Sequence, residues 1–228
     1  MKLLDTTSGN TKIKKTQDSG DNVRLAGLSL MPDNILCPGS KAAGCMEDCL
    51  KTSGLAGVYP TINKARQEKA DFFHNDREGF IKQLMRELSN FDKLCTKTGK
   101  QGCVRLNVLS DIQWEKLGIP QAFPNLFFYD YTKIASRLNS VNLPSNYKLM
   151  FSYSGRKQYK NQVELALKTD VPVAVVFRGG LPKTFLDRPV IDGDKSDLFN
   201  VKAGKVVVGL VAKGKARKSD SDFIVNNI

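Results

Sequence analysis

Three of the five cysteines fall within residues 37–49, and this cluster is the strongest chemical signal in the sequence. Cys37, Cys45 and Cys49 follow the spacing C-x7-C-x3-C. Cys45 and Cys49 are four residues apart, so one helical turn would place both sulfurs on the same face. Gly39 and Gly44 let the loop fold back and bring Cys37 to that face. Converging thiolates are costly unless a cation shares them, so we predict a metal centre here.

Ligand sets made only of cysteine select iron–sulfur centres or zinc. The other two cysteines are not expected to contribute. Cys95 lies at the end of a predicted helix and Cys103 at the start of a predicted strand, whereas the cysteine loop follows a strand and so lies at the opposite edge of a parallel sheet. A structural zinc site normally has four protein ligands, so three cysteines favour a 4Fe-4S cluster, with zinc as the alternative.

Three cysteines leave the fourth iron of such a cluster open or bound by another group. Asp111, Asp130 or a small molecule from outside the chain could fill that position. The odd number of cysteines also excludes a complete set of disulfides within one chain.

The elements that must position this loop are predicted to be alternating strands and helices. The predicted strands are Arg24–Met31, Val104–Leu109, Leu126–Tyr131, Lys148–Tyr153, Pro172–Phe177 and Val206–Ala212, with a short one at Val190–Ile191. Alternation with helices favours a parallel sheet. The run Val173–Phe177 is apolar on both faces, as a strand covered on both sides should be. The pattern predicts an α/β fold, namely a partial (β/α) barrel of about six to seven mostly parallel strands; an open doubly wound sheet is the main alternative.

Helical periodicity is clearest in two consecutive segments, at about residues 60–75 and 77–95. In the second, Phe80, Leu84, Leu88 and Phe91 recur at helical spacing and form one apolar face. A further helix is predicted at Lys157–Lys168. The chain is expected to form a single domain over residues 1–228, with an irregular N-terminal arm at 1–22 and the barrel with its cysteine loop at 23–228.

Polar side chains follow several of the predicted strands, where a parallel barrel gathers its functional groups. They are Asn107, Ser110, Asp111, Asp130, Lys133, Ser152, Ser154, Arg178, Lys213 and Arg217. Together they predict a mixed-charge pocket, suited to a small polar or anionic ligand, on the same rim as the cysteines. Each residue alone could equally form a turn or cap a helix.

The formal net charge of +12 raises the question of nucleic acid, but the basic residues are spread along the chain. We expect chiefly a solvated surface, with a general attraction to polyanions as the weaker alternative. No apolar run approaches the roughly 20 residues that span a bilayer. No signal-peptide core follows Met1, so we expect a cytosolic protein.

Beyond these local signals, the sequence resembles the phage protein family called gene product 88, over almost the whole chain. The resemblance is carried by the cysteine segment and by the motifs Arg105-Leu-Asn107, Ser110-Asp111-Ile112, Tyr129-Asp130-Tyr131-Thr132-Lys133, Phe151-Ser152-Tyr153-Ser154, Asp192-Gly193-Asp194 and Gly209–Arg217. It implies a phage origin, and hence the cytoplasm of the infected bacterial host, rather than a particular reaction.

More distantly, clustered cysteines after the first strand of a partial barrel resemble the radical S-adenosylmethionine enzymes. Those enzymes use C-x3-C-x2-C, and the amino acid part of their cofactor occupies the fourth iron. This chain has a different spacing, and no Gly-Gly-Glu follows its second strand. Both departures count against binding of S-adenosylmethionine.

Three functions follow as hypotheses. The first is an iron–sulfur protein whose open iron binds or activates a small molecule. The second is a cluster protein for electron transfer or sensing, without catalysis. The third is a basic, nucleic-acid-associated phage protein in which zinc braces the loop. The sequence names no substrate or reaction, since a fold does not dictate function.

Overall fold

The structure is a computed structural model that describes residues 1–6, 22–46, 49 and 54–226. Most of the predicted N-terminal arm lies outside the described residues. The strands are β1 (Leu4–Asp5), β2 (Val23–Leu28), β3 (Gln101–Arg105), β4 (Phe127–Thr132), β5 (Tyr147–Ser152), β6 (Val173–Phe177), β7 (Thr184–Phe185), β8 (Arg188–Asp192), β9 (Val207–Val211) and β10 (Ile224–Val225). The helices are α2 (Ser40–Ala43), α3 (Pro60–Asn75), α4 (Arg77–Lys97), α5 (Lys160–Leu167) and α6 (Asp197–Lys202). Short 3-10 turns are η2 (Gly54–Gly57), η3 (Trp114–Leu117), η4 (Ala135–Arg137), η5 (Lys157–Tyr159) and η6 (Gly214–Lys218).

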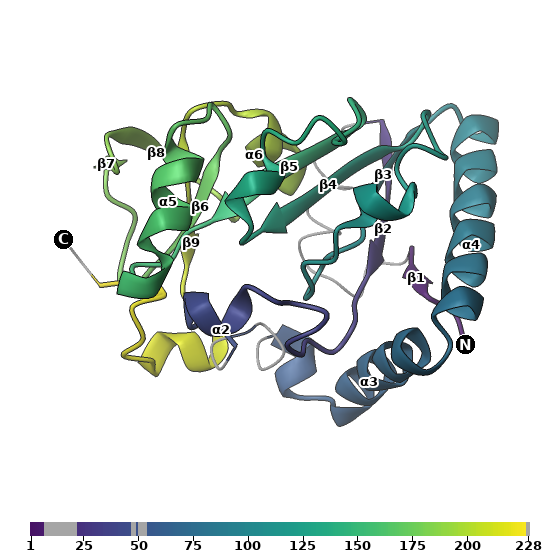
Figure 1. Cartoon of the computed structure of the whole chain (residues 1–228), viewed down its shortest axis with the longest axis horizontal. Helices are drawn as coiled ribbons and strands as arrows, with labels where there is room; N and C mark the ends of the chain where they lie inside the picture. Colours follow the sequence, from purple (N-terminus) through teal and green to yellow (C-terminus); the bar gives the residue numbers. More distant parts are fainter. Residues whose placement is uncertain (7–21, 47–48, 50–53, 227–228) are drawn as a thin grey trace.

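In the described residues, ten strands form one sheet with the order β1-β2-β3-β4-β5-β6-β9-β8-β7, and β10 pairs with β6. The strands from β2 to β6 are neighbours in chain order and all parallel, while β9 lies between β6 and β8. Among the described strands, only β1 (with β2) and β7 (with β8) pair antiparallel, at the two edges. The prediction of a mixed α/β fold with a mostly parallel sheet is confirmed, and the sheet is open rather than closed (Figure 1).

Each of the seven predicted strands has a counterpart, but one prediction was misplaced. The segment predicted at Val104–Leu109 is β3 at Gln101–Arg105, which starts and ends earlier. The chain leaves the sheet after Arg105 because Asn107 bonds to the loop that follows it. The weak strand expected at Val190–Ile191 is the longer β8, paired with β9.

The helix α4 covers one face of the sheet. Asp76 begins it by accepting a hydrogen bond from the Gly79 backbone at 2.8 Å, which satisfies one of the free N–H groups of the first turn. The apolar face predicted for this helix is confirmed: Phe80, Leu84, Leu88 and Phe91 are all buried in the main core. That core also contains strand residues of β2 to β6, Trp114 of η3 and Ala166 of α5.

The opposite face of the sheet carries a second apolar cluster. Leu25, Tyr129, Met150 and Val208 lie on this face and pack with Leu198 and Val201 of α6, as one cluster of buried residues. In Figure 1, α4 stands at the right and α5 at the left, while α2 and, in yellow, η6 lie in the lower half of the view. Helices on both faces explain why β6 is apolar throughout.

The packing of α4 gives a first testable prediction. Leu84→Ala should lower the free energy of unfolding by about 2–5 kcal/mol, because it removes a fully buried side chain from the core and leaves a cavity. Urea denaturation measures this change. The control, Lys82→Ala on the exposed face of the same helix, should change it by less than about 0.5 kcal/mol. Equal effects of the two variants would contradict the packing described for α4.

Candidate metal centre

A tight turn delivers Cys37 to the site. The Asp33 carboxylate accepts hydrogen bonds from the Ile35 and Leu36 backbones, each at 2.8 Å, and the Cys37 backbone donates to the Asp33 carbonyl at 2.9 Å. His74, from α3, lies 2.7 Å from the same carboxylate. Partial burial alone would raise the pKa of Asp33, but these hydrogen bonds and His74 hold it below its ordinary value of 3.8. The contact between Asp33 and His74 therefore connects this turn to α3 just before Cys37.

The short helix α2 then separates Cys37 from Cys45. The Ser40 backbone donates to the Cys37 carbonyl at 3.0 Å, and the Cys45 backbone donates to the Ser40 carbonyl at 3.2 Å. Gly44 ends the helix at a φ of 70°, a left-handed conformation that favours glycine. The helical turn predicted between Cys45 and Cys49 includes residues 47 and 48, which lie outside the described residues.

Residues that follow β3, β4 and β5 hold this cysteine loop in place. The Ser154 hydroxyl donates to the Ala43 carbonyl at 2.7 Å, and Nη1 of Arg156 donates to the Lys41 carbonyl at 3.1 Å. The Asp111 backbone donates to the Leu36 carbonyl at 2.8 Å. A Cβ atom added at Gly39 would lie 2.8 Å from Cβ of Lys133, so glycine is needed for this close approach. The loop thus lies where the carboxyl ends of successive parallel strands meet.

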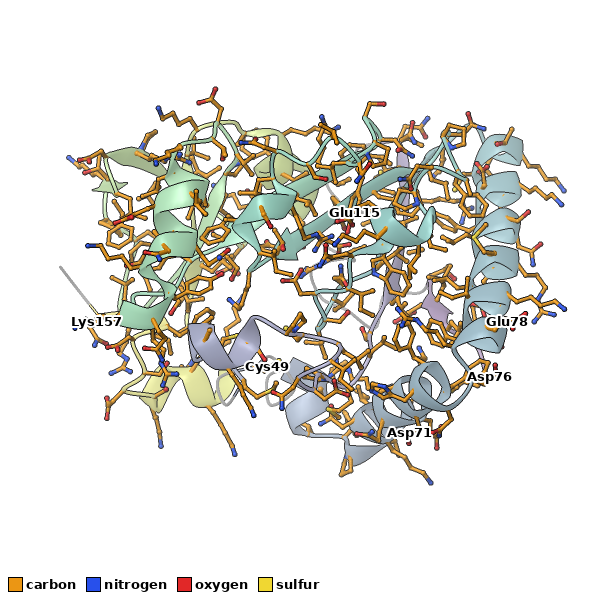
Figure 2. The ribbon with its side chains drawn as sticks, viewed as in Figure 1. Cys49, Asp71, Asp76, Glu78, Glu115 and Lys157 are labelled. Atoms are coloured by element: carbon orange, nitrogen blue, oxygen red, sulfur yellow. The ribbon has the colours of Figure 1, made fainter. Side chains whose placement is uncertain are left out.

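The three thiols are close enough to influence one another. Cys37, Cys45 and Cys49 are all half-buried. Burial, with smaller contributions from Asp111 and the other two cysteines, raises the pKa of the Cys37 thiol to about 12, and Lys133 opposes this change. Figure 2 shows Cys49 below the strands, near α2. Cys45 and Cys49 thus lie near enough to Cys37 to affect its thiol, and the metal centre itself stays a prediction.

Two basic side chains lie beside the thiols. Nζ of Lys133 donates to the Ser152 hydroxyl at 2.8 Å and lies 4.6 Å from the centre of the Phe223 ring. Burial lowers the pKa of Arg66, and the neighbouring Cys49 counters part of that change. The positive charge of Lys133 and Arg66 would favour thiolates, or an anionic centre, in this region.

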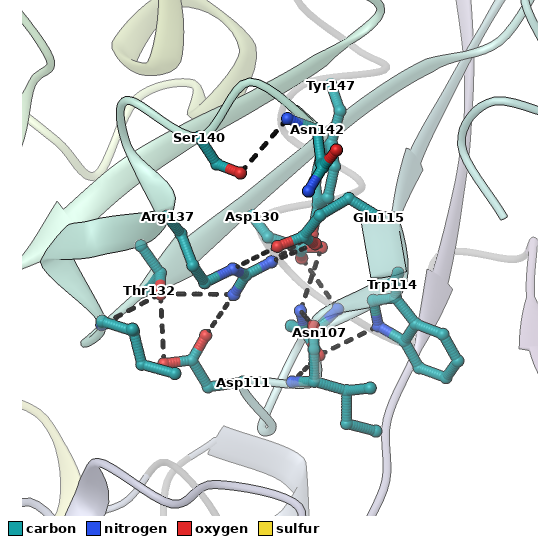
Figure 3. Close-up of polar contacts among 12 residues, drawn as sticks. Asn107, Asp111, Trp114, Glu115, Asp130, Thr132, Arg137, Ser140, Asn142 and Tyr147 are labelled. Atoms are coloured by element: carbon teal, nitrogen blue, oxygen red, sulfur yellow. Dashed lines mark hydrogen bonds and ion pairs between the residues drawn. The ribbon is translucent and has the colours of Figure 1, made fainter. Parts of the chain in front are cut away.

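A buried network of ion pairs and hydrogen bonds lies next to the cysteine loop (Figure 3). The guanidinium of Arg137 donates to both oxygens of Glu115 at 2.8 Å and to Asp111 at 2.5 Å. The other oxygen of Asp111 accepts from the Lys133 backbone at 2.7 Å and from Thr132 at 3.2 Å. Burial alone would lower the pKa of Arg137, but its anionic and hydroxyl neighbours raise it, so the guanidinium stays charged.

Asn107 and Asp130 form the second half of this network. The Asn107 amide oxygen accepts from Ser110, the Ile112 backbone and the Trp114 ring nitrogen at 2.8–3.0 Å. Asp130 accepts from the Asn107 backbone at 2.7 Å and from the Tyr147 hydroxyl at 2.8 Å. Burial raises the pKa of Asp130 from 3.8 to about 7, against the lowering effect of Arg105 and of these hydrogen bonds.

The structure divides the residues predicted to share a pocket into three groups. Asp111, Lys133, Ser152 and Ser154 lie at or beneath the cysteine loop. The side chains used within the buried network are Asn107, Ser110 and Asp130. The remaining three residues bond elsewhere, away from the cysteine loop. Arg178 contacts Ser219 and Asp220, Lys213 donates to Asp194 at 2.5 Å, and Arg217 donates to the Ala212 carbonyl.

Sequence reasoning missed several residues that position the loop. The carboxylate Asp33, its partner His74 and the network residues Glu115 and Arg137 were not identified. An Asp directly after Pro32 is a turn signal that could have indicated Asp33. Nothing in the local sequence marks Arg137, because its partners lie 22 and 26 residues away.

Cys95 and Cys103 lie at the other end of the sheet, as predicted. Cys95 is near the end of α4, close to Gly102, and Cys103 is in the first half of β3.

Across residues 1–6, 22–46, 49 and 54–226, no three His, Cys, Asp or Glu side chains form a group that could hold a single metal ion. In the same residues, no helix is long and apolar enough to cross a membrane.

Comparison with known families identifies the relationship that the motifs predicted. A family model described as gene product 88 matches residues 1–227. The chain belongs to the gene product 88 family. No curated protein and no solved structure matches the chain. The predicted family resemblance is therefore confirmed, and the family description names no activity.

The buried carboxyl of Asp130 predicts a pH-dependent stability. Its pKa is about 7 in the folded protein and 3.8 ordinarily, so the folded state holds a proton that the unfolded chain has released. This group's contribution to the free energy of unfolding is therefore largest below about pH 4 and falls as pH rises to about 7. Relative to Asp130→Asn, the wild type should lose about 2 kcal/mol between pH 5 and 7.

Urea denaturation at several pH values measures this difference. Asp170→Asn, at an exposed carboxyl outside the network, serves as the control. A difference between wild type and Asp130→Asn that stays constant with pH would contradict the raised pKa.

Proposed function

We propose that this member of the gene product 88 family is an iron–sulfur protein in which Cys37, Cys45 and Cys49 bind a 4Fe-4S cluster. The observation that carries the proposal is the fold of the loop, in which backbone hydrogen bonds of Ser40 join Cys37 and Cys45, and Cys49 and Lys133 lie near enough to affect the Cys37 thiol. Without a cation, a pKa near 12 keeps Cys37 protonated at neutral pH, so the site as it stands disfavours the thiolate. A bound metal core supplies the missing positive charge and releases the thiol protons.

The surroundings fit a centre of this charge. Three thiolates outweigh the charge of an oxidised 4Fe-4S core, so the bound centre is a net anion. Lys133 and Arg66 place positive charge beside it. The soft, all-thiolate donor set suits iron–sulfur chemistry better than it suits a hard cation such as Mg²⁺. When bound, such a cluster supplies one-electron chemistry and, at an iron without a protein ligand, a position for a small molecule.

The fourth iron is proposed to be open to a ligand from outside the chain. Of the two carboxylates that could reach it, Asp111 is bound to Arg137, Thr132 and the Lys133 backbone, and Asp130 is held by Asn107 and Tyr147. Using either one would break a buried hydrogen bond or ion pair, at a cost of about 3–5 kcal/mol for the pair. A small polar or anionic molecule, with Lys133 close by, is therefore the favoured occupant.

Electron transfer or sensing without catalysis is the second candidate. It is favoured by the half-buried position of all three cysteines, which would let a redox partner approach the cluster.

The open, mostly parallel sheet is compatible with derivation from an incomplete (β/α) barrel. We propose that the protein acts in the cytoplasm of the infected host. The net charge of +12 leaves attraction to nucleic acid as a further possibility, which salt would weaken.

Anaerobic purification tests the proposal directly. The wild-type protein, purified or reconstituted with iron and sulfide, should be brown, absorb near 400 nm, and contain about four irons per chain. Cys37→Ala, Cys45→Ala and Cys49→Ala should each lose most of the iron, whereas Cys103→Ala, a matched cysteine at the other end of the sheet, should retain it. A colourless wild-type protein that contains zinc would overturn the iron–sulfur assignment.

The ligand of the open iron can be tested with S-adenosylmethionine as one probe. The different cysteine spacing and the absence of Gly-Gly-Glu predict no spectral change and no 5′-deoxyadenosine when it is added to the reduced protein. Product formation in the wild type, and its loss in Cys45→Ala, would instead establish radical chemistry and contradict this prediction.

A further inference from the structure

Ser40 carries a buried hydroxyl that makes no hydrogen bond to any described residue. The residue is 2 % exposed, at the start of α2. Among the described residues its Oγ finds no hydrogen-bond partner. The nearby Ser154 hydroxyl, by contrast, donates to the Ala43 carbonyl at 2.7 Å. A buried hydroxyl without a partner costs about 1–3 kcal/mol, and none of the described residues provides an acceptor for this one.

The position of Ser40 indicates where that acceptor would be. Its backbone N–H bonds to Cys37 and its carbonyl accepts from the Cys45 backbone. Sγ of Cys45 also lies 3.8 Å from the Ser40 carbonyl oxygen. Ser40 is therefore bonded on both sides to cysteines of the proposed site, and a serine hydroxyl can rotate about χ1 to reach a nearby acceptor.

We propose that the Ser40 hydroxyl donates a hydrogen bond to a sulfur of the metal centre and thereby raises its reduction potential. This inference rests on the cluster proposed above. A sulfur bound to metal carries negative charge and accepts hydrogen bonds, and that charge increases when the cluster takes up an electron. The hydrogen bond therefore stabilises the reduced state more than the oxidised state. Hydrogen bonds to sulfur are among the factors that set cluster potentials.

Ser40 thus acts as a positioning and tuning residue and not as a ligand. Its role is separate from that of Lys133, whose ammonium already donates to Ser152. A residue with a merely structural role would stabilise the protein without metal. Ser40 should do the reverse, because removing an unpaired buried hydroxyl relieves its desolvation cost.

The experiment compares the wild type with Ser40→Ala, with Ser40→Thr retaining the hydroxyl and the exposed Ser136→Ala as the matched control. Redox titration of the cluster-loaded proteins, followed by electron paramagnetic resonance, measures the potential. Ser40→Ala should keep its iron but be reduced about tenfold less at a fixed potential. For a one-electron couple this is about 59 mV more negative. Ser40→Thr and Ser136→Ala should stay near the wild-type potential.

Urea denaturation of the metal-free proteins supplies the second measurement. Ser40→Ala should unfold at the same urea concentration as the wild type or at a higher one. Equal potentials of wild type and Ser40→Ala, at equal iron content, would overturn the role of Ser40 and leave the cluster intact. A wild type that takes up no iron would overturn both proposals, so the two failures are distinguishable.

Discussion

The ion pair between Asp111 and Arg137 is the interaction on which the cysteine site most depends. Both side chains are only 2 % exposed, and their atoms approach to 2.5 Å. Breaking such a buried pair costs about 3–5 kcal/mol, because it leaves an uncompensated charge in the interior. The Asp111 backbone N–H also donates to the Leu36 carbonyl, and its carboxylate accepts from the Lys133 backbone. The single residue Asp111 therefore connects the approach to Cys37, through its backbone, with the end of β4, through its carboxylate.

The polar residues that follow the parallel strands have two different roles: some form the buried network, and others contact the cysteine loop. Carboxyl ends of neighbouring parallel strands meet at one edge, so side chains after β3, β4 and β5 come together. Some of them bond to side chains of the main core: Asn107 accepts from Trp114, and Asp130 accepts from Tyr147. They become part of the buried network that fixes the loops. Those nearer the cysteine loop, such as Lys133 and Ser154, contact it directly or lie beside the thiols. Rigid support of this kind is what a metal centre requires of its surroundings.

The sequence predicted the elements better than the roles of individual residues. Strands such as β6 and the face of α4 were predicted because apolar residues recur at the period of each structure. The placement of Cys95 away from the cysteine loop followed from the alternation of strands and helices. In contrast, Asn107 and Asp130 were expected on an open rim. Their use in a buried network depends on Tyr147 and Arg137, which are distant in sequence, so no local pattern could have indicated it.

Three cysteines are proposed to hold a 4Fe-4S cluster with one iron open to an outside ligand. The most direct measurement is the electron paramagnetic resonance spectrum of the reduced, anaerobic protein, recorded with and without small anionic ligands such as carboxylic acids. We expect the spectrum of a reduced 4Fe-4S cluster, with a change in its signal when a ligand binds the open iron. A protein that gives no cluster signal after reconstitution would contradict the claim, and a cluster signal that no added ligand alters would contradict the open iron.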